Sequence, residues 1–261
     1  MSNSRGSLHL LDDKDPVSHL TYAVFLDEIG DKELTEKHFK AAIELDPNYL
    51  NANQAYAVFL GKCRKRNADA INQFEKTLNL DPDNVPAINA YARFLCDKKL
   101  SRKQAKRAEE LFLKALSIDP GHIQSRLSYA LLLKRQKRFK EAEVQFRAAI
   151  ESEEDTYAAR QAYAVFLKEQ EEYSRAQEQF LKAFDPRLKR YKSRLHNAMI
   201  HNAYADLLDK MGAIEKEITS HFEQALDVDP DDSKARFHLL LTHKAFGEFL
   251  CRKKKLEDAM K

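Results

Sequence analysis

The sequence has few of the residues that interrupt helices. Its 261 residues include only 6 glycines and 7 prolines, and it has no tryptophan. Glycine and proline are the strongest helix breakers, so their scarcity argues against a loop-rich or all-β fold. The length is enough for a sizeable core, in one extended domain or in two small ones. We therefore expect a chain built of many helices.

Membrane spans, a signal peptide and paired cysteines are missing as well. No apolar run reaches the roughly 18 residues of a membrane-spanning helix, and the N-terminus lacks the basic start and apolar stretch of a signal peptide. The 3 cysteines form no C-x-x-C pair, which argues against a disulfide framework and a zinc site. These absences predict a cytoplasmic protein in a reducing compartment, without membrane association; a nuclear location stays open.

An excess of charge of one sign is also lacking. Lys and Arg total 44 against 41 for Asp and Glu, so the net charge is only +3 although 33% of the residues are charged. Bulk charge therefore gives no argument for a nucleic-acid partner.

What the sequence does contain is an internal repeat. The string Tyr-Ala-x-Phe-Leu begins at Tyr22, and its copies and looser variants recur at intervals of 34 to 41 residues. The tyrosines of this series are Tyr22, Tyr56, Tyr91, Tyr129, Tyr163 and Tyr204. Within each copy the Tyr, the small residue and the Leu fall on one helical face.

A second series follows each copy of the first. A Phe is followed three residues later by Ala or Thr, as in Phe39 with Ala42, and Asp-Pro closes four of the units, as in Asp46-Pro47. The phenylalanines are Phe39, Phe74, Phe112, Phe146, Phe180 and Phe222. Each unit thus reads as two amphipathic helices, which bury both faces only when copies stack into a solenoid. Gly30, Gly61 and Gly212 lie after the first helix, where a left-handed residue is favoured.

These residues resemble the tetratricopeptide repeat family over roughly residues 17 to 261. The chain departs from the family pattern by using Tyr where Leu is frequent and by lacking an early Trp. The resemblance implies an all-α, right-handed α-solenoid of stacked helical hairpins, with about six full repeats and a partial seventh. We interpret the aromatic series as core packing.

The repeat boundaries follow from this spacing. Residues 1–16 form an N-terminal tail, the six repeats fill 17–233, and 234–261 form a partial seventh repeat with a long C-terminal helix. The repeats cover approximately 17–50, 51–85, 86–123, 124–157, 158–187 and 188–233. Two insertions of about two helical turns predict long first helices over Arg187–Met211 and Ser233–Lys253. Leu188, Tyr191, Leu195 and Met199 are expected to face Phe237, Leu240 and Leu241. The chain stops one turn into the next helix, so it is either a fragment or closed by its last long helix.

The family resemblance implies that the first helices line a concave groove. The polar candidates for contact with a peptide there are Asn51, Gln54, Asn89, Arg93, Lys134, Gln161, Lys168, Asn202 and Asp206. Asn and Gln can pair with an extended peptide backbone, and the cations can hold an acidic side chain or C-terminus. Some family members clamp the C-terminal carboxylate of chaperones, but the matching positions here cannot donate a side-chain hydrogen bond: Leu20, Val24, Ala55, Pro86 and Ala90. The alternative is a merely solvated groove.

The turns within the repeats are basic and those between repeats are mostly acidic, which predicts two oppositely charged edges. The basic edge consists of Lys62, Arg64, Lys65, Arg66, Lys98, Lys99, Arg102, Lys103, Arg135, Lys137 and Arg138, and the turn Arg252–Lys255 continues it. It is suited to an acidic protein or to nucleic acid. The alternative is that these cations only complement helix C-termini and keep the chain soluble.

Motifs of catalysis are lacking. There is no phosphate-binding loop, no G-x-G-x-x-G and no H-E-x-x-H. His196 with His201, and His238 with His243, are five residues apart and so lie on different helix faces. We therefore expect no enzymatic activity, no cofactor and no metal.

Three classes of function remain. The first is a non-catalytic adaptor or scaffold that binds a segment of another protein in the groove. The second is an RNA-associated helical-repeat protein that uses the basic edge. The third is a structural subunit of a larger assembly, with self-association through the C-terminal helices.

Overall fold

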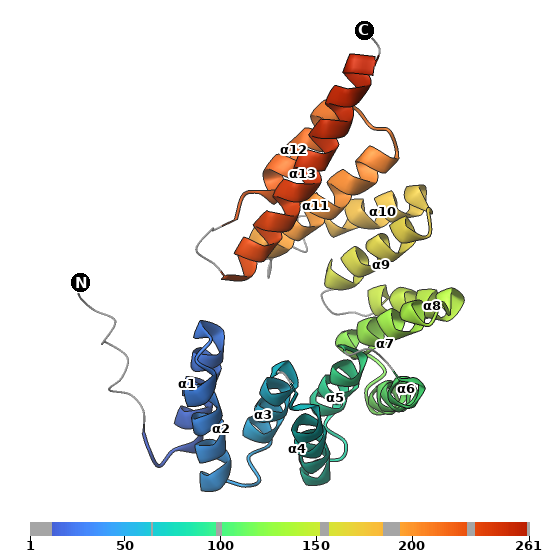
Figure 1. The fold of residues 1–261 in the computed structure, drawn as a ribbon. Helices are drawn as coiled ribbons and strands as arrows, with labels where there is room; N and C mark the ends of the chain where they lie inside the picture. Colours follow the sequence, from blue (N-terminus) through green and yellow to red (C-terminus); the bar gives the residue numbers. More distant parts are fainter. Residues whose placement is uncertain are drawn as a thin grey trace, which may run out of the picture. The chain divides into compact units, whose positions relative to one another are not determined.

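The computed structural model describes residues 12–63, 65–97, 101–151, 157–184, 194–228 and 233–259. Across these ranges every regular element is an α-helix, and thirteen helices follow one another along the chain (Figure 1). They are α1 (Pro16–Ile29), α2 (Lys32–Leu45), α3 (Leu50–Lys62), α4 (Asn67–Leu80), α5 (Val85–Asp97), α6 (Arg102–Ile118), α7 (Ile123–Arg135), α8 (Phe139–Ile150), α9 (Tyr157–Glu169), α10 (Tyr173–Ala183), α11 (Arg194–Lys210), α12 (Glu215–Ala225) and α13 (Ser233–Ala259).

The chain divides into two compact units, Met1–Ala142 and Glu143–Lys261. In unit 1 the hairpins are α1 with α2, α3 with α4 and α5 with α6, and in unit 2 they are α9 with α10 and α11 with α12. The first helices of successive hairpins also touch: α1 contacts α3, α3 contacts α5 and α5 contacts α7. In unit 1 these first helices therefore form one row (Figure 1), whose surface we call the first-helix face.

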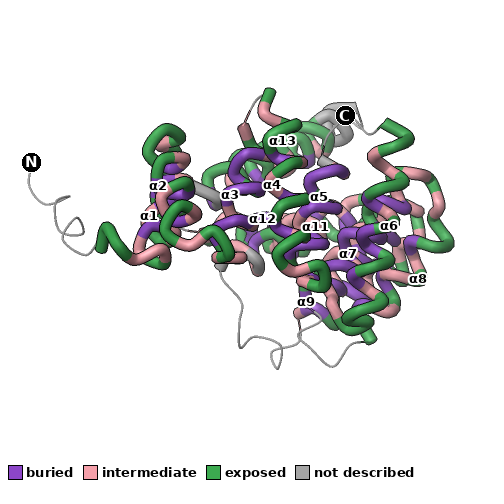
Figure 2. The backbone as a smooth tube through the Cα atoms, turned by 90° about the horizontal axis from the view of Figure 1, so that it is seen from below, coloured by how far each residue is buried: buried purple, intermediate pink, exposed green. Residues whose placement is uncertain are grey.

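The packing positions inferred from the repeat form the core. Ala23, Ala57 and Ala92 are fully buried, and Phe39 and Phe74 are at most 2% exposed. Five of the six series phenylalanines contact the Tyr of the next repeat, with ring centroids 5.9 Å apart for Phe39 and Tyr56, and Phe222 contacts Phe246 instead. Buried residues accordingly lie along the sides of helices that meet their neighbours (Figure 2). Contacts between aromatic rings therefore join consecutive repeats, and the aromatic series packs in the core as predicted.

Local signals set the ends of the helices. The Asp15 carboxylate accepts hydrogen bonds from the backbone of Val17 and Ser18 at the start of α1, and Ser101 forms a capping box with Gln104 at the start of α6. Gly30, with φ of 86°, ends α1 in the left-handed conformation.

Gly61 is not the left-handed turn residue that the sequence predicted. It lies inside α3, and Lys65, with φ of 63°, takes the left-handed position after that helix. A Cβ atom on Gly61 would come within 2.7 Å of Cδ2 of Phe94. The glycine is therefore needed for the close approach of α5 to α3.

The end of the chain departs from the expected repeat. α13 begins at Ser233 as predicted but continues through Ala259, so Arg252–Lys255 lies within a helix and is no turn. No proline interrupts this stretch, and its one glycine, Gly247, costs a helix only about 1 kcal/mol relative to alanine, so the helix continues. α11 begins at Arg194 and ends at Lys210. The start predicted for it, together with Leu188 and Tyr191, lies outside the described residues.

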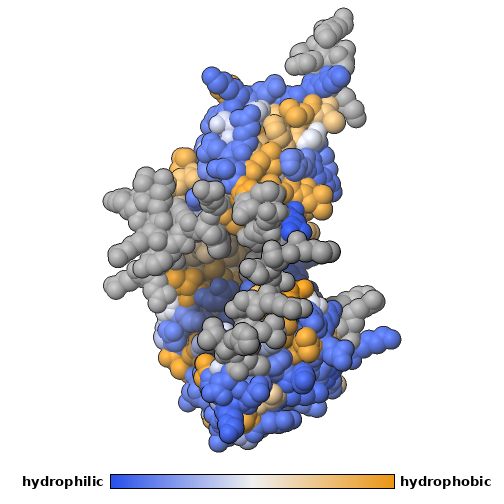
Figure 3. Space-filling model, turned by 90° about the vertical axis from the view of Figure 1, so that its left-hand side faces the viewer, coloured by the Kyte–Doolittle hydropathy of each residue, from blue (hydrophilic) through white to orange (hydrophobic). Residues whose placement is uncertain are grey.

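The two long helices α11 and α13 contact each other, but the described apolar residues that were predicted to meet there are largely exposed. Phe237 and Leu240 are each 66% exposed, and Leu241 and Met199 are also exposed. Apolar surface interrupts the hydrophilic surface at the level of α11–α13 (Figure 3). No helix in the described ranges has the length and apolar character that crossing a bilayer requires.

Candidate protein-binding face of unit 1

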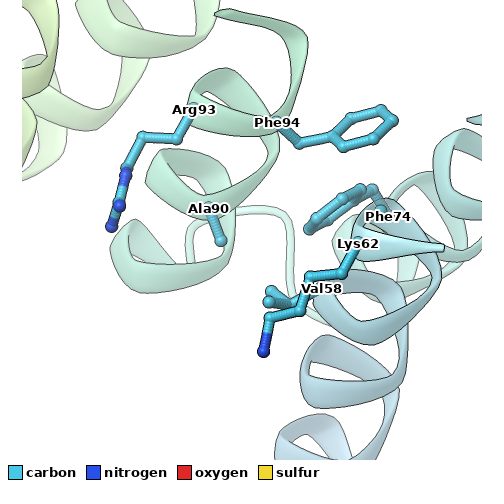
Figure 4. Close-up of a pocket in the computed structure, with 7 residues that line it drawn as sticks. Val58, Lys62, Phe74, Ala90, Arg93 and Phe94 are labelled. Atoms are coloured by element: carbon cyan, nitrogen blue, oxygen red, sulfur yellow. The ribbon is translucent and has the colours of Figure 1, made fainter. Parts of the chain in front are cut away.

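Two cavities adjoin on the first-helix face. The first, of about 360 Å³, lies between α3 and α5 and is lined by Val58, Gly61, Lys62, Phe74, Ala90, Arg93 and Phe94 (Figure 4). The second, of about 330 Å³, lies between α5 and α7 and is lined by Arg93, Cys96, Phe112, Ser128, Leu131, Leu132, Lys134 and Arg135. Arg93 lines both, so the two cavities adjoin at this residue.

The chemistry of the two linings is apolar and cationic. Val58 and Leu131 are exposed apolar side chains that occupy the same repeat position as Arg93. Four cations line the cavities, and among the described residues no carboxylate does. The Lys62 ammonium is paired with Asp27 at 2.6 Å, and the Arg135 guanidinium donates to the backbone oxygen of Cys96. The face can thus accommodate apolar side chains next to an acidic group.

Asn89 lies one helical turn before Arg93 on α5. Its side chain is only 5% exposed, yet within the described part of the chain its Oδ1 has no hydrogen-bond donor. A buried amide oxygen without a partner costs free energy, and Asn89 lines neither cavity. The predicted residues Asn51 and Gln54, on α3, are exposed and half-buried respectively.

The groove residues predicted in the later repeats lie in unit 2. The Lys168 ammonium donates to the Asp206 carboxylate at 2.6 Å, so these two charges are already paired within the fold. Asn202 has a buried Oδ1 without a described donor, like Asn89 in unit 1, and Gln161 is half-buried. The predicted set is therefore split between two units, and of its members only Arg93 and Lys134 line the two cavities.

Some cations of the predicted basic edge form ion pairs within the protein. Arg66 bonds Glu36 at 2.6 Å, and Arg138 bonds Glu109 at 2.7 Å. The hydrogen bond from Arg66 is the main cause that lowers the pKa of Glu36 to about 2. Lys65 and Lys137 are left-handed turn residues, and Arg102 and Lys103 are exposed at the start of α6. Arg64, Lys98 and Lys99 lie outside the described residues.

Histidine pairs are a feature that sequence reasoning missed. His19 contacts His38 across the first hairpin, and His201 contacts His221 across the α11–α12 hairpin. The signal was present, because each pair lies three residues before a repeat Tyr and one before a repeat Phe. Over the described residues no group of three or more His, Cys, Asp or Glu side chains is arranged to hold a metal ion.

Comparison with known proteins identifies the fold. No protein-family profile matches the chain. The structure superposes on yeast Tom70 with a TM-score of 0.72 and 21% identity, over 95% of this chain and 51% of that one. It superposes on PilF of Pseudomonas aeruginosa with a TM-score of 0.59 and 18% identity, over 89% of this chain and 98% of that one.

Two further proteins are similar to the chain. A tetratricopeptide repeat protein from Parabacteroides merdae gives a TM-score of 0.62 and 14% identity, over 87% of this chain and 84% of that one. A stretch of 60 residues, 23% of this chain, is 35% identical to Protein O-mannosyl-transferase Tmtc2 of Drosophila melanogaster and covers 6% of that protein. The chain thus has the fold that the resemblance implied, an all-α solenoid like that of tetratricopeptide-repeat proteins. Solenoids of this class typically serve as surfaces for binding other proteins.

Proposed function

We propose that the chain is a non-catalytic adaptor that binds an extended peptide segment of another protein on the first-helix face of unit 1. The observation that carries this proposal is the pair of adjoining cavities that share Arg93. Apolar side chains of the segment fill the cavities, and an acidic side chain between them pairs with Arg93.

The spacing of the face suits an extended chain. Neighbouring packed helices lie roughly 8–10 Å apart, and an extended chain advances about 3.3 Å per residue. Two apolar side chains about three residues apart can therefore enter the two cavities, with the acidic residue between them. Arg93 is exposed and lies at the centre of this arrangement.

The test is a selection from a random 12-residue peptide library displayed on phage, performed on the purified chain. We expect enrichment of peptides with an acidic residue flanked by apolar residues. The Arg93→Glu variant should weaken the binding of individual selected peptides at least tenfold, because it reverses the central charge. Lys76→Glu makes the same charge change on exposed α4 and should leave binding unchanged.

The outcomes of these experiments distinguish peptide binding from RNA binding. Failure to enrich any peptide, or equal binding by Arg93→Glu, would contradict the proposal. The RNA-associated function predicted from the basic edge is tested with a fluorescent single-stranded RNA. RNA binding that weakens steeply with salt and survives Arg93→Glu would favour that function instead.

A further inference from the structure

Three junctions between repeats contain the same cluster of side chains. A Glu on the second helix of one repeat accepts a hydrogen bond from the buried Tyr of the next repeat and pairs with an Arg of that repeat. The clusters are Glu36–Tyr56–Arg66, Glu109–Tyr129–Arg138 and Glu143–Tyr163–Arg175. The Tyr hydroxyl lies 2.8–2.9 Å from the carboxylate in all three. The fold therefore repeatedly builds a site for one carboxylate.

The junction between α4 and α5 lacks this carboxylate. Each of the three Glu residues stands three residues before the core Phe of its helix, and Ile71 stands at this position before Phe74. The Tyr and the Arg of the cluster are nevertheless present. Tyr91 is 3% exposed, and Arg107 directly precedes buried Ala108, as Arg175 precedes buried Ala176.

A cavity of about 600 Å³ opens at this junction. Its lining residues are Ile71, Glu75, Tyr91, Leu95, Lys103, Gln104, Lys106, Arg107 and Glu110. Its base is apolar, and three cations outnumber two carboxylates around it. Both carboxylates make long contacts, with Glu75 at 3.5 Å from the Tyr91 hydroxyl and Glu110 at 3.4 Å from Arg107.

These carboxylates do not replace the missing one. Glu75 is exposed, whereas the side chains of Glu36, Glu109 and Glu143 are 23–27% exposed and lie within the junction. The pKa of Tyr91 is raised by burial and by Glu75, while the charge of Arg107 opposes this increase. Arg107 therefore acts electrostatically on Tyr91, as expected for two groups that face one site.

We propose that this cavity binds an aspartate or glutamate side chain of a partner protein, and that its carboxylate takes the position between Tyr91 and Arg107 that an internal Glu fills at the other junctions. The Tyr91 hydroxyl donates to the carboxylate, and Arg107 pairs with it. Lys103 and Lys106 add attraction at the rim, and Ile71 and Leu95 contact the aliphatic part of the side chain. The site is separate from the first-helix cavities, because the two sets share no lining residue.

The test uses the blocked tripeptide acetyl-Gly-Glu-Gly-amide as a probe, with acetyl-Gly-Gln-Gly-amide as its neutral counterpart. NMR spectra of the full chain, labelled at tyrosine rings and arginine side chains, are recorded at constant ionic strength. We expect saturable shifts of the Tyr91 and Arg107 signals with the Glu peptide alone. No saturable shift, or equal shifts with the Gln peptide, would overturn the proposal.

The decisive variant restores the internal carboxylate. Ile71→Glu copies the other three junctions, so it should fill the site and lower the affinity for the Glu peptide at least tenfold, whereas Ile71→Leu should retain it. Tyr91→Phe keeps the ring but removes the donor, and should also weaken binding; Tyr129→Phe alters a filled junction and should not. Arg93→Glu on the first-helix face should leave this response unchanged. Undiminished binding by both Ile71→Glu and Tyr91→Phe would refute the assignment.

Discussion

The Nδ1 atoms of His19 and His38 lie 2.9 Å apart between α1 and α2, and the two rings stack with their centroids 5.1 Å apart. The pair of His201 and His221 in unit 2 repeats this geometry, with 2.8 Å between the Nδ1 atoms and 5.1 Å between centroids. At this distance one Nδ1 must donate and the other accept, so each pair shares one proton on these atoms. The α3–α4 hairpin has a neutral pair there instead, in which Gln73 donates to Asn53 at 2.8 Å.

We expect the stability of the protein to fall as the pH drops below about 6.5, the usual value for an unfolded histidine. Burial, the charge of His19 and the charge of Lys37 lower the pKa of His38, and burial lowers the pKa of His221. The unfolded chain therefore binds more protons than the folded one between about 6.5 and the lower folded pKa, so stability increases with pH through this window. Each pKa unit of difference corresponds to about 1.4 kcal/mol. The measurement is the free energy of unfolding in urea at a series of pH values.

Charged groups near the two histidine pairs affect the histidine pKa values in both directions. Asp13 favours the protonated form of His38, and Glu217 favours that of His221. His19 Nε2 lies 3.3 Å from the backbone oxygen of Asp13. The control replaces both pairs with Asn and Gln, as in Asn53–Gln73, and should show a smaller decrease in stability over the same pH range. An unchanged decrease in that variant would contradict the role of the histidine pairs.

A second prediction contrasts two buried asparagines. Asn89→Leu should be neutral or should stabilise the protein by about 1 kcal/mol, because it removes a buried oxygen without a donor. Asn53→Leu should destabilise it by about 1–3 kcal/mol, because its amide donates to the backbone of Pro47 and Tyr49. Chemical unfolding measures both. Destabilisation of equal size in the two variants would show that the Asn89 side chain is satisfied within the protein.

The third prediction concerns the close approach of α3 and α5. Gly61→Ala places a Cβ against the buried ring of Phe94, and overpacking of this kind costs about 1–3 kcal/mol. This exceeds the gain of about 1 kcal/mol from helix propensity, so we expect net destabilisation. Gly247 lies in helix α13 and has nothing within 4 Å of its Cβ position, so Gly247→Ala should stabilise. Thermal unfolding of the two variants should therefore shift in opposite directions, and a shift to higher temperature in both would contradict the contact.

The sequence predicted the packing positions well because the same residues recur at the same places in successive repeats. It could not predict Gly61 correctly, because a glycine near a helix end looks the same in the sequence in two cases. It can form a turn, or it can leave space for an aromatic ring of another helix. From the sequence, histidines were compared only within single helices. His19 and His38 instead meet across a hairpin, at a separation of 19 residues. The cavities around Arg93 depend on three helices, and composition alone does not reveal which cations the fold has already paired.

The final prediction tests whether a filled junction stabilises the stack. Glu109 accepts hydrogen bonds from Tyr129 and Arg138, and its side chain is 23% exposed. After allowance for solvent screening, Glu109→Ala should cost about 1–2 kcal/mol, since it leaves a buried hydroxyl without its acceptor. Glu110→Ala removes a half-exposed partner 3.4 Å from Arg107 and should cost less than about 0.5 kcal/mol.

The Glu109→Ala variant should also change the titration of the Tyr129 hydroxyl. Burial, followed by the hydrogen bond to Glu109, raises the pKa of Tyr129 to about 12. Removing the carboxylate should lower this pKa, because the negative charge beside the hydroxyl is lost while Arg138 remains. NMR of labelled tyrosine rings between neutral and alkaline pH measures the shift. An unchanged Tyr129 titration in Glu109→Ala would show that burial alone sets the pKa, and the carboxylate would then have no role in holding consecutive repeats together.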